Sequence, residues 1–204
     1  MKMITGLIET KAGNIFFDGQ SIRSDLFGFK RRMGHVPEEP HLYSHLSGLE
    51  YLIMVGQLRG LPASPTADRI DALLRLLSLH SHRHARISSY SKGMQQKVLL
   101  SAALLHNPDL ILLDEPFSGL DISTSLVLRG LIQESAARGK VVLFSSHESE
   151  TVEQHDGGQK VKGWSADTDG SDANASIWGD NSGRGKMKIC VQREGWSAGC
   201  TDDC

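Results

Sequence analysis

The stretch Leu110-Ile111-Leu112-Leu113-Asp114-Glu115 decides the fold, because four consecutive aliphatic residues are followed directly by two acids. A continuous apolar run of this length is typical of a strand that is buried on both faces of a parallel sheet. Open α/β sheets bind ligands at the carboxyl ends of their strands, so Asp114 and Glu115 are candidate site residues. An Asp in this place can hold a hydrated cation, and a Glu beside it can orient or deprotonate an attacking water. A strand that simply ends in a solvated acidic turn is the alternative at this point.

Short apolar strands alternate with helical patterns on both sides of this stretch, which predicts a parallel α/β sheet. Helical apolar spacing begins at Ser47, a second helix is predicted to start at Pro65 with Ser64 as its cap, and a third follows Ser91. Residues 1–8 have the pattern of the end of a helix. The remaining predicted elements are strands at 14–17, 31–36 and 141–144 and helices at 123–138 and 148–154.

A second candidate site lies 23 positions before Asp114, in Tyr90-Ser91-Lys92-Gly93-Met94-Gln95-Gln96-Lys97. Ser91 is the predicted cap of the helix, and Gly93 lets a ligand approach the backbone closely. A helix N-terminus with free N–H groups and a nearby Lys is suited to bind phosphate. The acids are followed by a predicted rigid turn, Pro116-Phe117-Ser118-Gly119-Leu120-Asp121, and His147 follows the next strand at the same edge.

Together these residues resemble the ATP-binding subunit of ABC transporters. In this resemblance residues 90–95 are a variant of the signature motif, residues 110–115 are Walker B, residues 118–121 are the D-loop, and His147 is the switch histidine. Val36-Pro37-Glu38-Glu39-Pro40-His41-Leu42-Tyr43 is similar to the Q-loop region, with Glu38 where the family usually has a Gln that contacts magnesium. The motifs occur in the family's order over residues 1–154.

The resemblance implies ATP and Mg²⁺ as cofactors and gives the candidate residues their roles. Glu115 would be the catalytic base and His147 a second catalytic residue, while Asp114 and Glu38 would serve the magnesium ion. Ser91 and Gly93 would contact the γ-phosphate of ATP held by the opposite subunit. The residues implied in nucleotide binding are Ser91, Lys92, Gly93, Met94, Gln95 and Asp121.

The implied fold is α/β, an incomplete P-loop NTPase-type parallel sheet with a helical signature subdomain over residues 1–154. The implied partners are a membrane-spanning transporter subunit and a second ATP-binding subunit. The protein would then be cytoplasmic and peripheral to the membrane. The segments 36–43 and 89–97 resemble those of exporters, and the substrate is expected to be selected by the membrane-spanning partner.

The phosphate loop of this family, Gly-x-x-x-x-Gly-Lys-[Ser/Thr], does not occur in the sequence, since Gly139-Lys140 is followed by Val141 and Gly185-Lys186 by Met187. Without its backbone N–H groups and Lys, the triphosphate loses its main cradle. We therefore expect the chain by itself to hydrolyse ATP negligibly. In the family that this sequence resembles, the loop follows a core strand that lies beside residues 110–113. Because that strand would also be absent, we expect an exposed apolar edge along residues 110–113 and poor solubility.

Composition changes abruptly near residue 155 of the 204-residue chain. All 3 Cys and all 3 Trp follow residue 160, whereas every Leu, Phe, Tyr and Pro precedes residue 155. Residues 155–204 are rich in Gly, Asp, Ser and Asn and cannot bury enough apolar surface to offset chain entropy, so disorder is predicted. A frameshift at one codon would produce the same change.

Two other hypotheses remain beside a transport ATPase. The first is a catalytically inactive fragment of such a subunit. The second is a chromosome-maintenance or repair ATPase, but Ser91 lies only 53 positions after Glu38, too few for the long coiled-coil arm of those proteins. A net charge of -2 and the short basic run Lys30-Arg31-Arg32, without interleaved aromatic residues, give no indication of a nucleic-acid partner.

Overall fold

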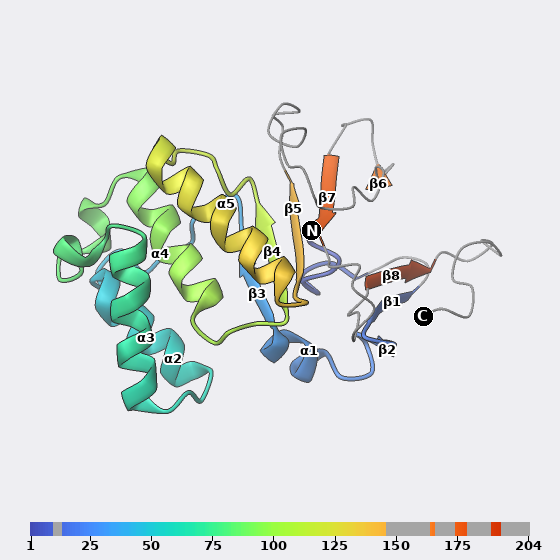
Figure 1. Cartoon of the computed structure of the whole chain (residues 1–204). Coiled ribbons are helices and arrows are strands. Elements are labelled where there is room, and N and C mark those ends of the chain that lie inside the picture. The colour runs from blue at the N-terminus through green and yellow to red at the C-terminus, as the bar shows by residue number, and fades with distance from the viewer. Residues whose placement is uncertain (10–13, 146–163, 166–173, 179–188, 193–204) are drawn as a thin grey trace.

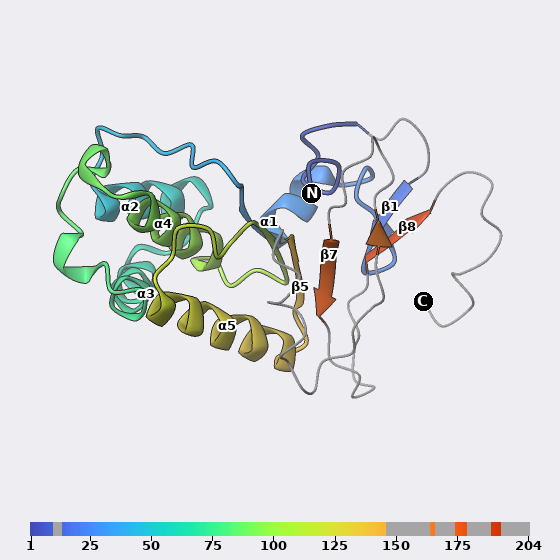
Figure 2. The same cartoon turned by 90° about the horizontal axis from the view of Figure 1, so that it is seen from above.

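The computed structural model describes residues 1–9, 14–145, 164–165, 174–178 and 189–192. Its centre is a sheet whose strands are ordered β3-β4-β5-β7-β6, with most of the helices on one face and a smaller sheet, β2-β1-β8, together with one short helix on the other. Figures 1 and 2 show α4 and α5 next to the central strands and α2 and α3 further out on the same side. The predicted α/β class is therefore confirmed.

The parallel part of the central sheet consists of β3 (Met33–Val36), β4 (Leu110–Asp114) and β5 (Val141–Ser145). β4 lies between the other two, with Leu112 opposite both His35 and Leu143. The four aliphatic residues of β4 are at most 3% exposed, as the apolar run predicts. The expected exposed edge along residues 110–113 is wrong, because both edges of β4 carry a paired strand.

Alternate residues of the central strands belong to two separate cores, as strand geometry requires. Ile111 and Leu113 pack with α4 (Lys92–Leu104) and α5 (Ile122–Ala137). Leu110 and Leu112 pack on the opposite face with β1 (Asn14–Phe17) and α1 (Leu26–Arg32). β4 is thus covered on both faces.

A third core lies within the helical part of the molecule. It joins α2 (Gly48–Leu58), α3 (Ala63–Leu76) and the outer face of α4 through residues such as Leu52, Ile70 and Val98. Ser91 caps α4 as predicted, and Ser47 caps α2 in a capping box with Glu50. Two 3₁₀ turns, His80–His82 and Ile87–Ser89, connect α3 to α4.

Two predicted element ends are corrected by the structure. Arg31 and Arg32 belong to α1 rather than to a strand, because Asp25 caps that helix and their charges complement its C-terminal dipole. α3 begins at Ala63 after Pro62, not at a cap on Ser64, and Pro65 fits within its first turn because the first N–H groups have no intrahelical partner.

Residues 1–8 contain consecutive turns and no assigned helix. Gly6 has φ +67, and the N–H groups of Gly6 and Leu7 donate to the carbonyls of Met3 and Lys2 at 3.2 and 3.0 Å. These two bonds have the pattern that ends a helix, so the predicted helix end is present only as its capping turn.

Three strands lie in the segment predicted to be disordered: β6 (Trp164–Ser165), β7 (Asn174–Trp178) and β8 (Ile189–Gln192). β7 pairs antiparallel with β5, and β8 pairs antiparallel with β1, which also pairs with β2 (Gln20–Ser21). These strands depart from the predicted disorder, which stays a prediction for the rest of 155–204. His147 and the helix predicted at 148–154 lie outside the described residues.

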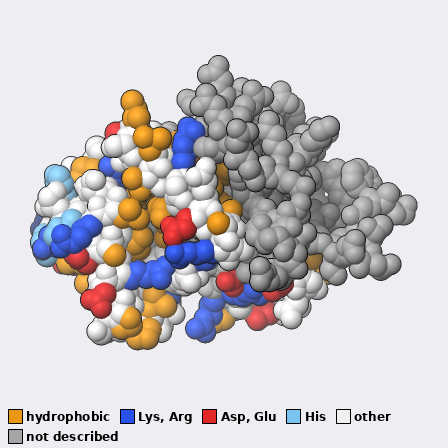
Figure 3. Space-filling model, in the orientation of Figure 1, with side chains coloured by type: hydrophobic (Ala, Val, Ile, Leu, Met, Phe, Trp, Pro, Cys, Tyr) orange, Lys and Arg blue, Asp and Glu red, His pale blue; other side chains and the backbone are white. Residues whose placement is uncertain are grey.

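Basic, acidic and apolar side chains are mixed on the face over α3 and α5 (Figure 3). No helix within the described ranges is both long and apolar enough to cross a membrane.

Candidate functional site

Asp114 and Glu115 lie where β4 reaches the carboxyl edge of the parallel sheet, as predicted. Asp114 is opposite Ser145, the last residue of β5. The Ser145 hydroxyl donates to Asp114 Oδ1 and accepts the backbone N–H of Glu115 at 3.2 Å. One side chain from β5 therefore contacts both acids of the neighbouring strand.

The backbone of Glu115 adopts φ +46, a left-handed conformation that a non-glycine residue enters at a cost of about 1–2 kcal/mol. The chain turns sharply here, and the Glu115 carbonyl accepts the N–H of Ser118 at 3.1 Å. Strained residues of this kind persist where neighbouring contacts hold them, and they occur often at functional sites. With this conformation the chain leaves the direction of β4 directly after Asp114.

His35 lies on β3 opposite Leu112, two residues before Asp114 on β4. Burial lowers the pKa of His35 below its ordinary value of 6.5, while the Asp114 carboxylate opposes this shift and the N-terminal amine adds to it. Glu38 is exposed in the loop directly after β3, at the same carboxyl edge as Asp114, since β3 and β4 are parallel.

The predicted signature segment, residues 90–95, forms the beginning of α4. Ser91 Oγ accepts the N–H of Met94 at 3.2 Å, and Gln95 Nε2 donates to the carbonyl of Tyr90 at 3.3 Å. Tyr90 is buried and its hydroxyl donates to the carbonyl of His82 at 2.6 Å. Ser91 is exposed at the start of the helix, which suits it for contact with a molecule outside this chain.

The signature segment packs directly against the D-loop of the same chain. A Cβ added to Gly93 would lie 2.5 Å from the carbonyl oxygen of Gly119, so only glycine allows this approach. Gly119 has φ +74, and Lys92 Nζ lies 3.5 Å from Ser118 Oγ. Gly93 was expected to admit a ligand, and in this structure its open side faces the D-loop backbone.

An ion pair joins the same two segments one turn further along α4. Lys97 is 9% exposed, and its Nζ lies 3.0 Å from Asp121 Oδ2. The other oxygen of Asp121 accepts hydrogen bonds from Ser123 Oγ and from the Thr124 N–H in the first turn of α5. Ser123, the Thr124 N–H and Lys97 together hold the pKa of Asp121 well below its ordinary value of 3.8.

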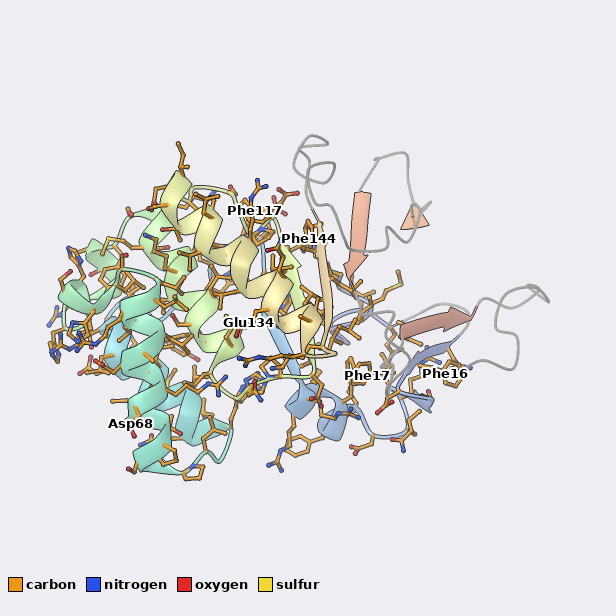
Figure 4. All side chains as sticks on the ribbon, in the orientation of Figure 1. Phe16, Phe17, Asp68, Phe117, Glu134 and Phe144 are labelled. Carbon is orange, nitrogen blue, oxygen red and sulfur yellow. The ribbon has the colours of Figure 1, made fainter. Side chains whose placement is uncertain are left out.

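The turn between the acids and the D-loop is held by aromatic packing. Phe117 meets Phe144 of β5 edge to face, with ring centroids 6.2 Å apart (Figure 4). The guanidinium of Arg129 on α5 lies 5.3 Å from the centroid of the Phe117 ring. These contacts fix the path of the chain from Glu115 to Asp121.

The structure thus brings the predicted residues together in two groups. Asp114 and Glu115 meet at the sheet edge, and the signature segment meets the D-loop beside them. Sequence reasoning missed Ser145, His35 and Lys97. Ser145 could have been found from its place directly before Ser146 and His147 at the end of a predicted strand, whereas no local pattern distinguished the other two.

Among the described residues, no group of three or more His, Cys, Asp or Glu side chains could hold a metal ion alone. Mg²⁺ is commonly bound by one or two carboxylates together with waters and substrate phosphates. Asp114, with Glu38 at the same edge, fits that donor set. A magnesium ion here would therefore need phosphate oxygens as further ligands, and a nucleotide supplies them.

A parallel α/β sheet with two acids at its carboxyl edge, beside a serine-capped helix that packs on the following turn, defines a nucleotide-binding protein of the P-loop NTPase class. The family model described as ABC transporter matches residues 1–118. The chain belongs to this family of ABC transporter ATP-binding proteins.

Its relatives include an uncharacterized ABC transporter ATP-binding protein of Methanocaldococcus jannaschii, 33% identical over 154 residues, which covers 76% of this chain and 54% of that protein. The ABC transporter ATP-binding protein NatA of Bacillus subtilis is 37% identical over 154 residues, covering 75% of this chain and 63% of NatA. A solved ATP-binding subunit of an ABC transporter superposes with TM-score 0.68 at 33% identity, covering 74% of this chain and 62% of that one. The chain therefore spans less than two thirds of these proteins.

Proposed function

We propose that this chain is part of an ATP-binding subunit that binds and hydrolyses ATP to power transport by a membrane-spanning partner. The observation that carries the proposal is the packing of the signature segment on the D-loop, the turn that follows Asp114 and Glu115 at the end of β4. In this proposal Asp114 and Glu38 serve Mg²⁺, Glu115 is the general base toward the attacking water, and His147 is the switch residue.

The proposed subunit acts as a dimer with a second ATP-binding subunit. Ser91 caps its own helix by accepting the Met94 N–H, and it stands exposed at the start of α4. This exposure at a helix N-terminus supports contact with a phosphate brought by another molecule. The signature residues Ser91, Lys92, Gly93, Met94 and Gln95, together with Asp121, would then act on ATP held by the other subunit.

The direction of transport that we propose is export, and the protein would lie in the cytoplasm against its membrane partner. The support is the resemblance of residues 36–43 and 89–97 to exporter subunits. One relative is the Phospholipid-transporting ATPase ABCA3 of Rattus norvegicus, 34% identical over 152 residues, which cover 74% of this chain and 9% of that protein. Its name makes a lipid-like amphiphile the first substrate class to test.

Turnover of Mg·ATP by two proteins tests the proposal: the 204-residue chain, and the same chain fused behind the segment of NatA that precedes the aligned part. We expect negligible hydrolysis by the chain and steady turnover by the fusion. Glu115→Gln should reduce the turnover of the fusion by at least about 100-fold, the scale of a lost general base. Gln133→Glu, an exposed change on α5, is the control and should leave turnover unchanged.

A fusion that binds ATP but does not hydrolyse it would favour the alternative, a catalytically inactive fragment. Equal turnover by the fusion and by its Glu115→Gln variant would contradict the role of Glu115 as base. The two results are distinguished by measuring binding of a fluorescent ATP analogue to the same samples.

A further inference from the structure

We infer that Ser145 is a positioning residue for both acids of the site, holding the Asp114 carboxylate and the strained backbone of Glu115 through one hydroxyl. This inference rests on the proposed function and deepens it, because it names a residue that sets the geometry of the proposed metal ligand and the proposed base. The relation is visible only in the folded chain, since 30 positions separate Glu115 from Ser145.

The geometry of the hydroxyl supports this role on both sides. A serine hydroxyl has one proton to donate and two lone pairs to accept with. The proton goes to Asp114 Oδ1, and one lone pair accepts the Glu115 N–H at 3.2 Å. The bond to Oδ1 restrains the rotation of the carboxylate, so that Asp114 presents its other oxygen in one direction.

The strained backbone of Glu115 is the second reason why a hydrogen bond to Ser145 matters here. Its φ of +46 lies in the left-handed region, while Asp114 is the last residue of a regular parallel strand paired with β5. The register of β4 and β5 includes the pair Asp114 and Ser145, and Glu115 is the next residue along the chain. Ser145 Oγ accepts the N–H of Glu115 directly after this pair.

Pairing within the sheet and the buried residue before it hold Ser145 in place. Phe144, its neighbour, is 5% exposed and packs against Phe117 on the far side of the same turn. Ser145 is thus held by β5 pairing and by the buried residue before it. The hydroxyl and the aromatic pair enclose the turn from both ends, which keeps the Glu115 backbone in one conformation.

Amide hydrogen exchange of the full chain tests the contact without requiring activity. The matched pair is Ser145→Thr, which keeps the hydroxyl, and Ser145→Val, which has nearly the shape of threonine without it. We expect the Glu115 amide to exchange at least 10-fold faster in Ser145→Val than in Ser145→Thr, with the Leu112 amide unchanged as the control for folding. Ser101→Ala removes a buried hydroxyl that bonds the Lys97 carbonyl in α4 and should not affect the Glu115 amide.

Turnover of the NatA fusion then tests the positioning role. Ser145→Val should lower kcat at least 10-fold with KM for Mg·ATP changed less than 3-fold, and Ser145→Thr should restore kcat. Equal exchange of the Glu115 amide in the Thr and Val variants overturns the inference, as does an active fusion whose kcat is indifferent to the hydroxyl. A fusion without any turnover counts against the proposed function alone, and the exchange measurement then decides the inference.

Discussion

Ser78 is a single residue whose strained backbone is offset by the packing of the leucines around it. It follows the C-cap of α3 with φ +56, and its N–H donates to the carbonyl of Arg75 at 3.0 Å. The N–H of Leu79 donates to the carbonyl of Leu74 at 2.7 Å, and both leucines are buried in one core. This pattern ends helices most readily with glycine in the position that Ser78 occupies.

Replacing Ser78 with Gly should therefore raise the free energy of unfolding by about 0.5–1 kcal/mol, because glycine removes the steric cost of the left-handed conformation. Urea unfolding followed by circular dichroism measures the change. Ser64→Gly, inside α3, is the matched control and should lower stability by a similar amount. A lower midpoint for Ser78→Gly would show that the serine stabilises this turn in another way.

The positions of the strands and helices show which elements local sequence patterns can predict. The cap at Ser91 and the aliphatic run of β4 predicted their elements correctly, because their physical causes are local. The start of α3 was misplaced because two prolines three positions apart both suit a helix beginning. Arg31 and Arg32 were placed in a strand because their helix is only 7 residues long and shows less than two full periods.

Substitutions in β4 test whether both faces of this strand are buried. Leu112 and Leu113 are 0% and 1% exposed and belong to the two opposite cores. Leu112→Ala and Leu113→Ala should each cost about 3 kcal/mol, the usual result of deleting a buried leucine side chain. Leu58→Ala, at a position 79% exposed, should change stability by less than about 0.5 kcal/mol. A loss below about 1 kcal/mol for Leu112→Ala would mean that β1 and α1 do not cover that face.

The ion pair between α4 and α5 is a second element-scale prediction. Asp121→Ala removes both the cap of α5 and the counter-charge of the nearly buried Lys97, whereas Asp121→Asn keeps the capping oxygen. Lys97→Met keeps the apolar stem and leaves Asp121 with its hydroxyl and N–H donors. The unfolding temperature should fall most for Asp121→Ala, less for Asp121→Asn and least for Lys97→Met, because an unpaired buried charge costs more than a lost exposed one. Equal shifts for all three would contradict the pairing of Lys97 with Asp121.

The order of the strands belongs to the whole molecule, and the sequence did not predict it. The patterns at 110–113 and 141–144 identify two buried strands but contain nothing that fixes which strand lies beside which. The neighbours of β4 are β3 and β5, contributed by segments far before and after it in the chain, and β7 closes the far edge of β5. The same long-range pairing brings Ser145 to Glu115. This part of the site, like the order of the strands, could therefore not be predicted from local sequence patterns.

His106 connects the stability of the whole molecule to pH. Its Nε2 lies 3.1 Å from the carbonyl oxygen of Met33, its Nδ1 has no partner among the described residues, and Arg59, Arg69 and Lys140 all lie near enough to oppose its charge. Burial first, and then these cations, lower its pKa from 6.5 to about 4. The ring is therefore neutral in the folded protein at pH 7, and with its proton on Nε2 it donates to Met33.

The unfolded chain binds this proton before the folded chain does as the pH falls. Stability from His106 is accordingly complete above about pH 6.5 and is lost between pH 6.5 and about 4. We expect a loss of about 1–2 kcal/mol over this window, discounted because the ring is partly exposed. His106→Gln keeps a donor for the Met33 carbonyl and cannot titrate, so urea unfolding at about pH 7 and about pH 4.5 should show a smaller loss for the variant. The same pH dependence in both proteins would mean that other groups, and not this buried imidazole, control the acid stability of the fold.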